Sequence, residues 1–144
     1  MKKRYKILLS ILLPLVILYV STMLLTRDSD FTKEVTERLD IEQINAIDII
    51  RASDEKTIII TDRAEIDQIM EQFKDQPLRK VYFGQSDFNE AYWITLHIND
   101  SHAVGLRLDD KNHLFVYLYE ENYMKDYKIL GDFNRSFIED VFKK

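Results

Sequence analysis

A chain of 144 residues with a formal net charge of −5 and no cysteine has material for one domain and excludes several classes of function. Without cysteine there is no disulfide framework, no thiolate nucleophile and no Cys-ligated zinc. Five bases and no acid lie in the first 27 residues, so residues 28–144 hold fifteen bases against twenty-five acids, about −10. Because phosphate backbones repel such a domain, we exclude nucleic acid as a partner.

An uncharged apolar run covers Ile7 to Thr26 and would be about 30 Å long as a helix, the thickness of a bilayer's hydrocarbon core. Four bases lie in residues 1–6, and the positive-inside rule keeps such an end in the cytoplasm. We therefore predict a cytoplasmic basic tail over 1–6, a single-pass transmembrane helix over 7–26 and an extracytoplasmic remainder. The alternative is a cleaved signal peptide, but Val20-Ser21-Thr22 is a poor cleavage site.

The next segment, residues 27–43, is charged and is expected to be a stalk or linker with a helical stretch over Phe31 to Leu39. The extracytoplasmic domain then covers 44–144. Two runs of alternating β-branched residues, Ile44 to Ala52 and Thr57 to Thr61, flank a polar turn and predict a hairpin.

A helix follows the hairpin. Asp62 and Glu65 have the spacing of a capping box, and apolar residues then recur at helical intervals, which predicts a helix from about Arg63 to Lys74. A second helix is predicted at the C-terminus, where Gly131-Asp132 provides a break and an N-cap before the apolar run that begins at Phe133.

Three more strands lie between the helices, separated by polar turn residues. They are Tyr92 to Ile98, Val104 to Leu108 and Leu114 to Tyr119. Two further candidate strands lie near Lys80 to Phe83 and over Tyr127 to Leu130. The order β-β-α-β-β-β-α, with about five strands, favours an α+β fold in which a mainly antiparallel sheet carries its helices on one face.

Alternation sorts the last three strands into an aliphatic face, suited to the core, and an aromatic, amphipathic face. Aromatic side chains and arginine are enriched where proteins bind each other, so the second face is a candidate partner-binding surface. Its candidate residues are Trp93, Arg107, Phe115, Tyr117 and Tyr119. Alternatively, a segment such as Gly84 to Glu90, or the one around Tyr123 and Tyr127, folds over these side chains and buries them.

Signatures of catalysis, metal binding and cofactor binding are missing from the sequence. His97, His102 and His113 lack the HxH and HxxxH spacings of metal sites. The polar stretches Asp87 to Glu90 and Asp109 to Asn112 lack the glycine of a calcium loop, and no serine lies in a Gly-x-Ser-x-Gly turn. We therefore expect no catalytic residue, no metal and no cofactor, and interpret these stretches as turns.

The predicted elements follow one another in a recognisable order: the Ile-rich hairpin INAIDIIRASDEKTIIITD, the capped helix DRAEIDQIMEQF, the meander opened by AYWITLHIND and the closing helix. This order resembles that of small exported domains of Gram-positive bacteria, the YhfM-like domains among them. The resemblance covers about residues 44 to 142. Members of that family are often lipoproteins attached through a cysteine, which this sequence lacks. The resemblance implies an accessory domain that faces the cell envelope, and it transfers no catalytic residue.

Three functional hypotheses follow. The first is a non-enzymatic, membrane-anchored extracytoplasmic module that binds another envelope protein through the aromatic face or the neighbouring loops. The second is a domain that binds or hydrolyses envelope material, which requires a concave polar pocket with perturbed carboxylates. The third is an immunity protein that intercepts an extracellular toxin.

Overall fold

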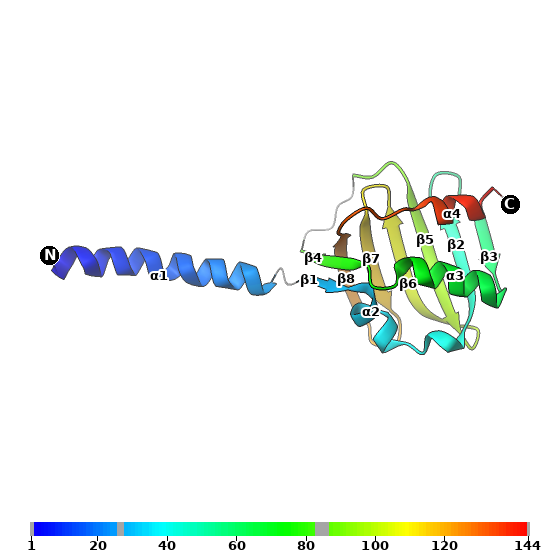
Figure 1. Ribbon diagram of the computed structural model, residues 1–144, viewed down its shortest axis with the longest axis horizontal. Coiled ribbons are helices and arrows are strands. Elements are labelled where there is room, and N and C mark those ends of the chain that lie inside the picture. The colour runs from blue at the N-terminus through cyan, green and yellow to red at the C-terminus, as the bar shows by residue number, and fades with distance from the viewer. Residues whose placement is uncertain (1, 26–27, 83–86, 144) are drawn as a thin grey trace.

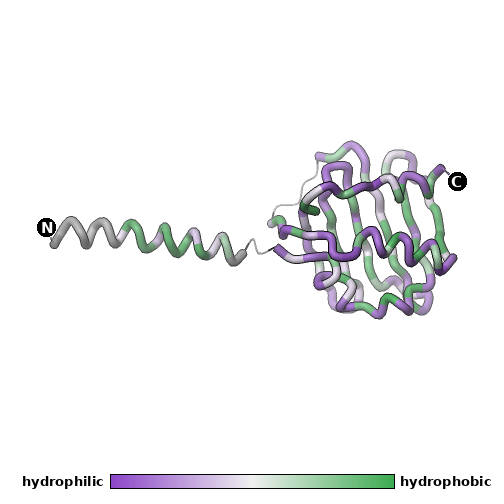
Figure 2. Tube along the Cα trace, viewed as in Figure 1, coloured by the Kyte–Doolittle hydropathy of each residue, from purple (hydrophilic) through white to green (hydrophobic). Residues whose placement is uncertain are grey.

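The chain forms one long helix followed by a sheet domain (Figure 1). This computed structural model describes the backbone of residues 2–25, 28–82 and 87–143, and the side chains of 10–23, 28–82 and 87–143. The long helix, α1 (Lys2–Leu25), extends away from the sheet, and its large apolar side chains between Ile11 and Val20 are exposed. Figure 2 shows this apolar character along the described part of α1.

Spanning a bilayer takes about 20 consecutive apolar residues in one helix. Among the residues that the structure describes, no helix combines that length with sufficient apolar character, so the transmembrane helix predicted over Ile7 to Thr26 is wrong.

The domain is built on one antiparallel sheet of eight strands in the order β1-β4-β8-β7-β6-β5-β2-β3. The strands are β1 (Asp28–Asp30), β2 (Ile44–Arg51), β3 (Thr57–Ile60), β4 (Pro77–Val81), β5 (Ala91–Ile98), β6 (Ser101–Asp109), β7 (His113–Leu118) and β8 (Tyr123–Ile129). The fold is thus mainly β. The predicted α+β fold with about five strands in the order β-β-α-β-β-β-α is wrong.

The strands that prediction missed or misplaced lie together at one side of the sheet. β1 has the sequence DSD, with no apolar residue to signal a strand, and it forms by pairing with β4. β4 begins at Pro77, a residue tolerated at the first position of a strand. Both candidate strands begin earlier than predicted, since β4 ends at Val81 and β8 covers Tyr123–Ile129. Phe83, the predicted end of the first, lies outside the described residues.

The helices of the domain lie together on one face of the sheet (Figure 1). They are α2 (Phe31–Glu34), α3 (Arg63–Phe73) and α4 (Ser136–Val141), with short 3-10 turns η1 (Thr36–Arg38) and η2 (Ile41–Gln43). The predicted cap of α3 is confirmed, because the Asp62 side chain accepts a hydrogen bond of 3.0 Å from the backbone N–H of Glu65. The C-terminal helix starts later than predicted. Its N-cap is Arg135, which makes no side-chain capping bond, and not Asp132.

The core lies between these helices and the aliphatic face of the sheet. Alternation predicts ten buried side chains in β5, β6 and β7, and nine are confirmed, each at most 5% exposed: Tyr92, Ile94, Leu96, Val104, Leu106, Leu108, Leu114, Val116 and Leu118. The tenth, Ile98, is only partly buried. The segment expected to be a stalk also contributes to the core. Phe31 and Val35 are wholly buried, and the Phe31 ring stacks on that of Phe73 with 5.0 Å between centroids. The described part of 27–43 is therefore part of the folded domain.

Candidate partner-binding face

The sheet face that α2, α3 and α4 leave uncovered carries the five predicted binding residues, and we call it the open face. Strand register brings three of them side by side, because Trp93 of β5 lies opposite Arg107 of β6, which lies opposite Phe115 of β7. Asp126 of β8 completes this row. In the next row Tyr117 lies between Gly105 and Met124. Four neighbouring strands thus assemble residues that are up to 33 positions apart in the chain.

The fifth residue, Tyr119, follows β7 and packs back over the sheet. Its ring centroid is 4.7 Å from that of Tyr117 and 5.4 Å from that of His102. The Tyr119 ring also lies beside Gly105, where a Cβ would be 3.5 Å from it, an ordinary van der Waals contact. The structure therefore places all five predicted residues on one face.

The Arg107 guanidinium lies among aromatic rings and a carboxylate on the open face. Its guanidinium carbon lies 5.4 Å from the ring centroid of Phe88, 5.7 Å from that of Trp93 and 5.6 Å from that of Phe115. A nitrogen of the same group lies 3.7 Å from a carboxylate oxygen of Asp126. The rings present their negative faces to the cation, an attraction of about 0.5–2 kcal/mol for each favourable contact. Arg107 is thus held in place by aromatic rings from three separate segments.

Sequence reasoning missed two members of this arrangement. Phe88 belongs to a loop and has no strand periodicity, and Asp126 belongs to a strand that was predicted to start after it. Of residues 84–90, the segment that the alternative folds over the face, the structure describes 87–90, and Phe88 is the one whose ring lies against Arg107. It covers Arg107, whereas residues 84–86 lie outside the described residues.

Exposure distinguishes the open face from the rest of the domain. Trp93 is 45% exposed and Tyr119 41%, while Phe115 and Tyr117 are half-buried. Outside α1, the large apolar side chains exposed among the described residues are Ile50, Ile59, Tyr82, Trp93, Tyr119 and Met124. Strand register places Ile50, Ile59, Trp93 and Met124 on the open face, and Tyr119 packs there against Tyr117, whereas Tyr82 lies off this face. Exposed apolar surface is therefore concentrated on one side of the sheet.

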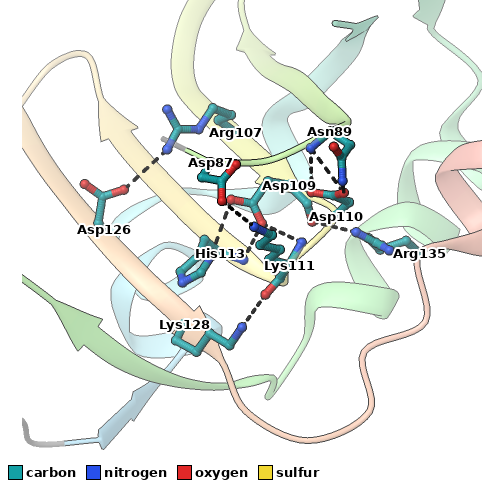
Figure 3. A network of polar contacts seen from close by, with 10 residues as sticks. All are labelled: Asp87, Asn89, Arg107, Asp109, Asp110, Lys111, His113, Asp126, Lys128 and Arg135. Carbon is teal, nitrogen blue, oxygen red and sulfur yellow. Dashed lines mark hydrogen bonds and ion pairs between the residues drawn. The ribbon is translucent and has the colours of Figure 1, made fainter. Parts of the chain in front are cut away.

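A network of polar contacts lies at one end of the open face (Figure 3). Asp109 is wholly buried, and one of its carboxylate oxygens accepts 2.9 Å hydrogen bonds from the backbone N–H groups of Lys111 and His113. Asp110 accepts hydrogen bonds from the backbone and side chain of Asn89, and the Lys111 ammonium lies 3.2 Å from Asp87. These bonds hold the Asp87–Asn89 segment to the sheet and so position Phe88 above Arg107. The predicted polar turn is thus a support for the face.

Two histidine–carboxylate pairs also lie on the open face. Nε2 of His97 is 3.0 Å from Asp48, and Nδ1 of His113 is 3.4 Å from Asp109, yet neither ring nitrogen makes a hydrogen bond of good geometry. A histidine beside a carboxylate can transfer protons. Among the described residues no group of three or more His, Cys, Asp or Glu side chains is arranged to hold a metal ion.

Two depressions lie away from the five predicted residues. One, of about 350 Å³, is lined by residues that include Arg38, Asp40, His102 and Glu121. The other, of about 620 Å³, lies beside β1, β4 and β8, where residues that include Glu34, Lys80, Lys125 and Tyr127 line it. None of the five predicted residues lines either depression. The five predicted residues thus lie outside both depressions, while His102, which packs against Tyr119, lines the first.

Comparisons with known proteins give little information on identity. No protein-family model matches this chain. No curated protein matches it either. It is similar to a solved structure described as "Crystal Structure of Putative Lipoprotein from Clostridium perfringens", with 20% sequence identity, a TM-score of 0.49, and coverage of 78% of this chain and 93% of that one. A likeness at this level assigns neither a family nor a function to the chain.

Proposed function

We propose that the domain is a non-enzymatic binding module that recognises another protein through the open face. The observation that carries the proposal is the concentration of exposed aromatic and aliphatic side chains there, while the opposite face is buried. Apolar surface left in water on one side of a folded domain is stabilised when a partner covers it. Tryptophan, tyrosine and arginine are the residue types that contribute most to such interfaces.

Preorganisation of the face supports this function. The Arg107 side chain is held by the rings of Phe88, Trp93 and Phe115, and it is only 19% exposed. Tyr117 and Tyr119 are held edge to face. A partner that docks here would order few side chains, which lowers the entropic cost of binding.

The cell-envelope setting of this proposal rests on the resemblance of residues 44 to 142 to small exported domains. The partner would then be another extracytoplasmic protein, for which the module serves as an accessory subunit. A toxin intercepted outside the cell would use the same face.

The alternative function, chemistry on envelope material, has the Asp48–His97 pair as its support. A His97→Ala variant separates the two. A binding module should keep its partner affinity when this histidine is lost, whereas a hydrolase that uses the pair should lose turnover.

A direct test begins with cross-linking and pull-down of the full chain, compared with the Trp93→Ala, Tyr117→Ala double variant. Truncation of interface hot spots costs about 2 kcal/mol or more, roughly a 30-fold change in Kd, so the double variant should lose the partner. Tyr82→Ala is the matched control, because Tyr82 is exposed but lies off the open face. A partner list that is the same for the double variant and the native chain would contradict the proposal.

Trp93 also offers a probe of where the partner binds, since it is the only tryptophan in the chain. Labelled with 5-fluorotryptophan, the protein should give one fluorine NMR resonance. Binding of an unlabelled partner to the open face should shift that resonance. A partner that binds without shifting it docks elsewhere.

A further inference from the structure

The two edges of the sheet differ in chemistry. The β1 edge is three residues long and carries two aspartates, one of which, Asp28, pairs with Arg79 at 2.8 Å. The β3 edge has the uncharged sequence TIII, and within the described residues β3 pairs only with β2. Charges and short length protect an edge strand from joining another chain, whereas an uncharged β-branched edge is open to it. Of the two edge strands in the described sheet, β3 is therefore the one whose chemistry suits pairing with another chain.

Backbone geometry identifies the groups that this edge presents. The N–H of Arg51 in β2 donates a 3.0 Å hydrogen bond to the carbonyl of Lys56, so the backbone polar groups of Lys56 point toward β2. In an antiparallel pair these groups alternate in direction from one residue to the next. The N–H and C=O groups of Thr57 and Ile59 are therefore turned outward. The Ile59 side chain is 65% exposed.

We propose that β3 pairs antiparallel with β3 of a second copy of this chain, about a two-fold axis at which Ile59 faces Ile59. In this register Ile59 lies opposite Ile59 of the other copy, and Thr57 lies opposite Thr61. Residues whose backbone N–H and C=O groups point away from β2 therefore lie opposite each other. Each Ile59 can then exchange both backbone hydrogen bonds with the other. The pairing joins two eight-stranded sheets into one continuous sheet.

Charge complementarity favours a second copy in this register over an unrelated strand. The positions that flank the edge are Lys56 and Asp62, three residues on either side of Ile59. The two-fold places Lys56 of each copy opposite Asp62 of the other, so both ends of the contact join opposite charges. Asp62 uses one carboxylate oxygen to cap α3, and Lys56 directs an N–H to the Phe142 carbonyl. A carboxylate and an ammonium can each accept or donate further bonds.

The side chains also fit such a contact. Ile59 lies beside Asp48 on the open face, and Ile58 lies beside Ile49 on the core face. In the dimer the two Ile59 side chains form a cross-strand pair, while Ile58 of each copy meets Ile60 of the other. The open faces of the two copies become neighbours, and a partner could then contact both.

The test measures the oligomeric state of the full chain by sedimentation equilibrium, with a non-ionic detergent present to shield the exposed apolar stretch of α1. The native chain should show a concentration-dependent monomer–dimer equilibrium. Ile59→Lys and Ile59→Glu each place like charges opposite each other at the two-fold, so each variant alone should raise the dimer dissociation constant at least about tenfold. An equimolar mixture of the two should recover the dimer, because lysine then faces glutamate.

Met124→Lys and Met124→Glu are matched controls, because Met124 is 63% exposed on the open face but belongs to β8. Both controls should dimerise like the native chain. Circular dichroism should show that all four variants are folded, since each substituted side chain is exposed. A native chain that stays monomeric at its highest soluble concentration would overturn the proposal, as would Ile59 variants that dimerise alone or a mixture that stays monomeric. The Trp93 experiments test partner binding to the open face and not backbone pairing at the β3 edge, so they are decided separately.

Discussion

Glu34 shows at the scale of one residue how a distant contact sets both stability and protonation. One of its carboxylate oxygens accepts 2.6 Å hydrogen bonds from the hydroxyls of Tyr123 and Tyr127. Burial raises the pKa of Glu34, but hydrogen bonds from Tyr123, Tyr127 and Ser29 outweigh this effect and lower the pKa below its ordinary value of 4.5. Burial, followed by the bond to Glu34, raises the pKa of Tyr127. The ionised carboxylate therefore joins α2 to β8.

We expect this contact to make stability depend on pH in the acid range. Because the pKa of Glu34 is lower in the folded state, its stabilisation is present above the unfolded pKa and is lost as pH falls through the folded pKa. Glu34→Gln should be less stable by about 1–3 kcal/mol at neutral pH and should lose part of the acid dependence. Urea unfolding between about pH 7 and pH 3 measures both effects.

The control for this experiment is Glu37→Gln, since Glu37 is a neighbouring exposed glutamate. It should keep the native dependence on pH. If Glu34→Gln kept it as well, the contact with the two tyrosines would not be the cause.

The cap of α3 is a prediction at the scale of a secondary-structure element. Asp62 has extended backbone angles and accepts the hydrogen bond from Glu65 that begins the helix. Asp62→Ala should lower the free energy of unfolding by about 1 kcal/mol, whereas Asp62→Asn should change it little, because asparagine is an equally good N-cap. Chemical denaturation measures both. Equal losses in the two variants would attribute the effect to charge and not to capping.

Elements differ in how far their sequence determines them. α3 was predictable because its cap and its apolar spacing are local, and β5 to β7 because alternation has a period of two. β1, β4 and β8 could not be placed from their own residues. β1 has no apolar residue, and the pairing of residues 28–30 with 77–79 spans a long stretch of chain. Such strands form because a neighbouring strand supplies hydrogen-bond partners.

At the scale of the whole molecule, Phe31 joins the segment after α1 to the core of the domain. Its side chain is wholly buried and stacks on Phe73, and its N–H donates a 3.0 Å hydrogen bond to the Gln76 carbonyl. Phe31→Ala should therefore lower the free energy of unfolding by about 3–5 kcal/mol, because it removes a ring and leaves a cavity. Urea unfolding of the full chain measures this loss.

Lys33→Ala is the matched control in the same short helix, because the Lys33 side chain is 64% exposed. It should change stability by no more than about 0.5 kcal/mol. If Phe31→Ala had an effect as small as that of the control, the result would support the prediction that residues 27–43 form a stalk outside the core.

By itself the sequence determined the helical conformation of α1, the cap and buried face of α3, the aliphatic core of β5 to β7 and the opposite placement of Trp93, Arg107, Phe115 and Tyr117. Each depends on neighbours a few positions away. Tertiary structure decided the strand order, the position of Phe88 over Arg107, the bonds from Tyr123 and Tyr127 to Glu34, and the place of β3 at the edge of the described sheet. These contacts join residues that are adjacent only after the sheet has formed, because periodicity assigns a side chain to a face but not to its neighbours on the next strand.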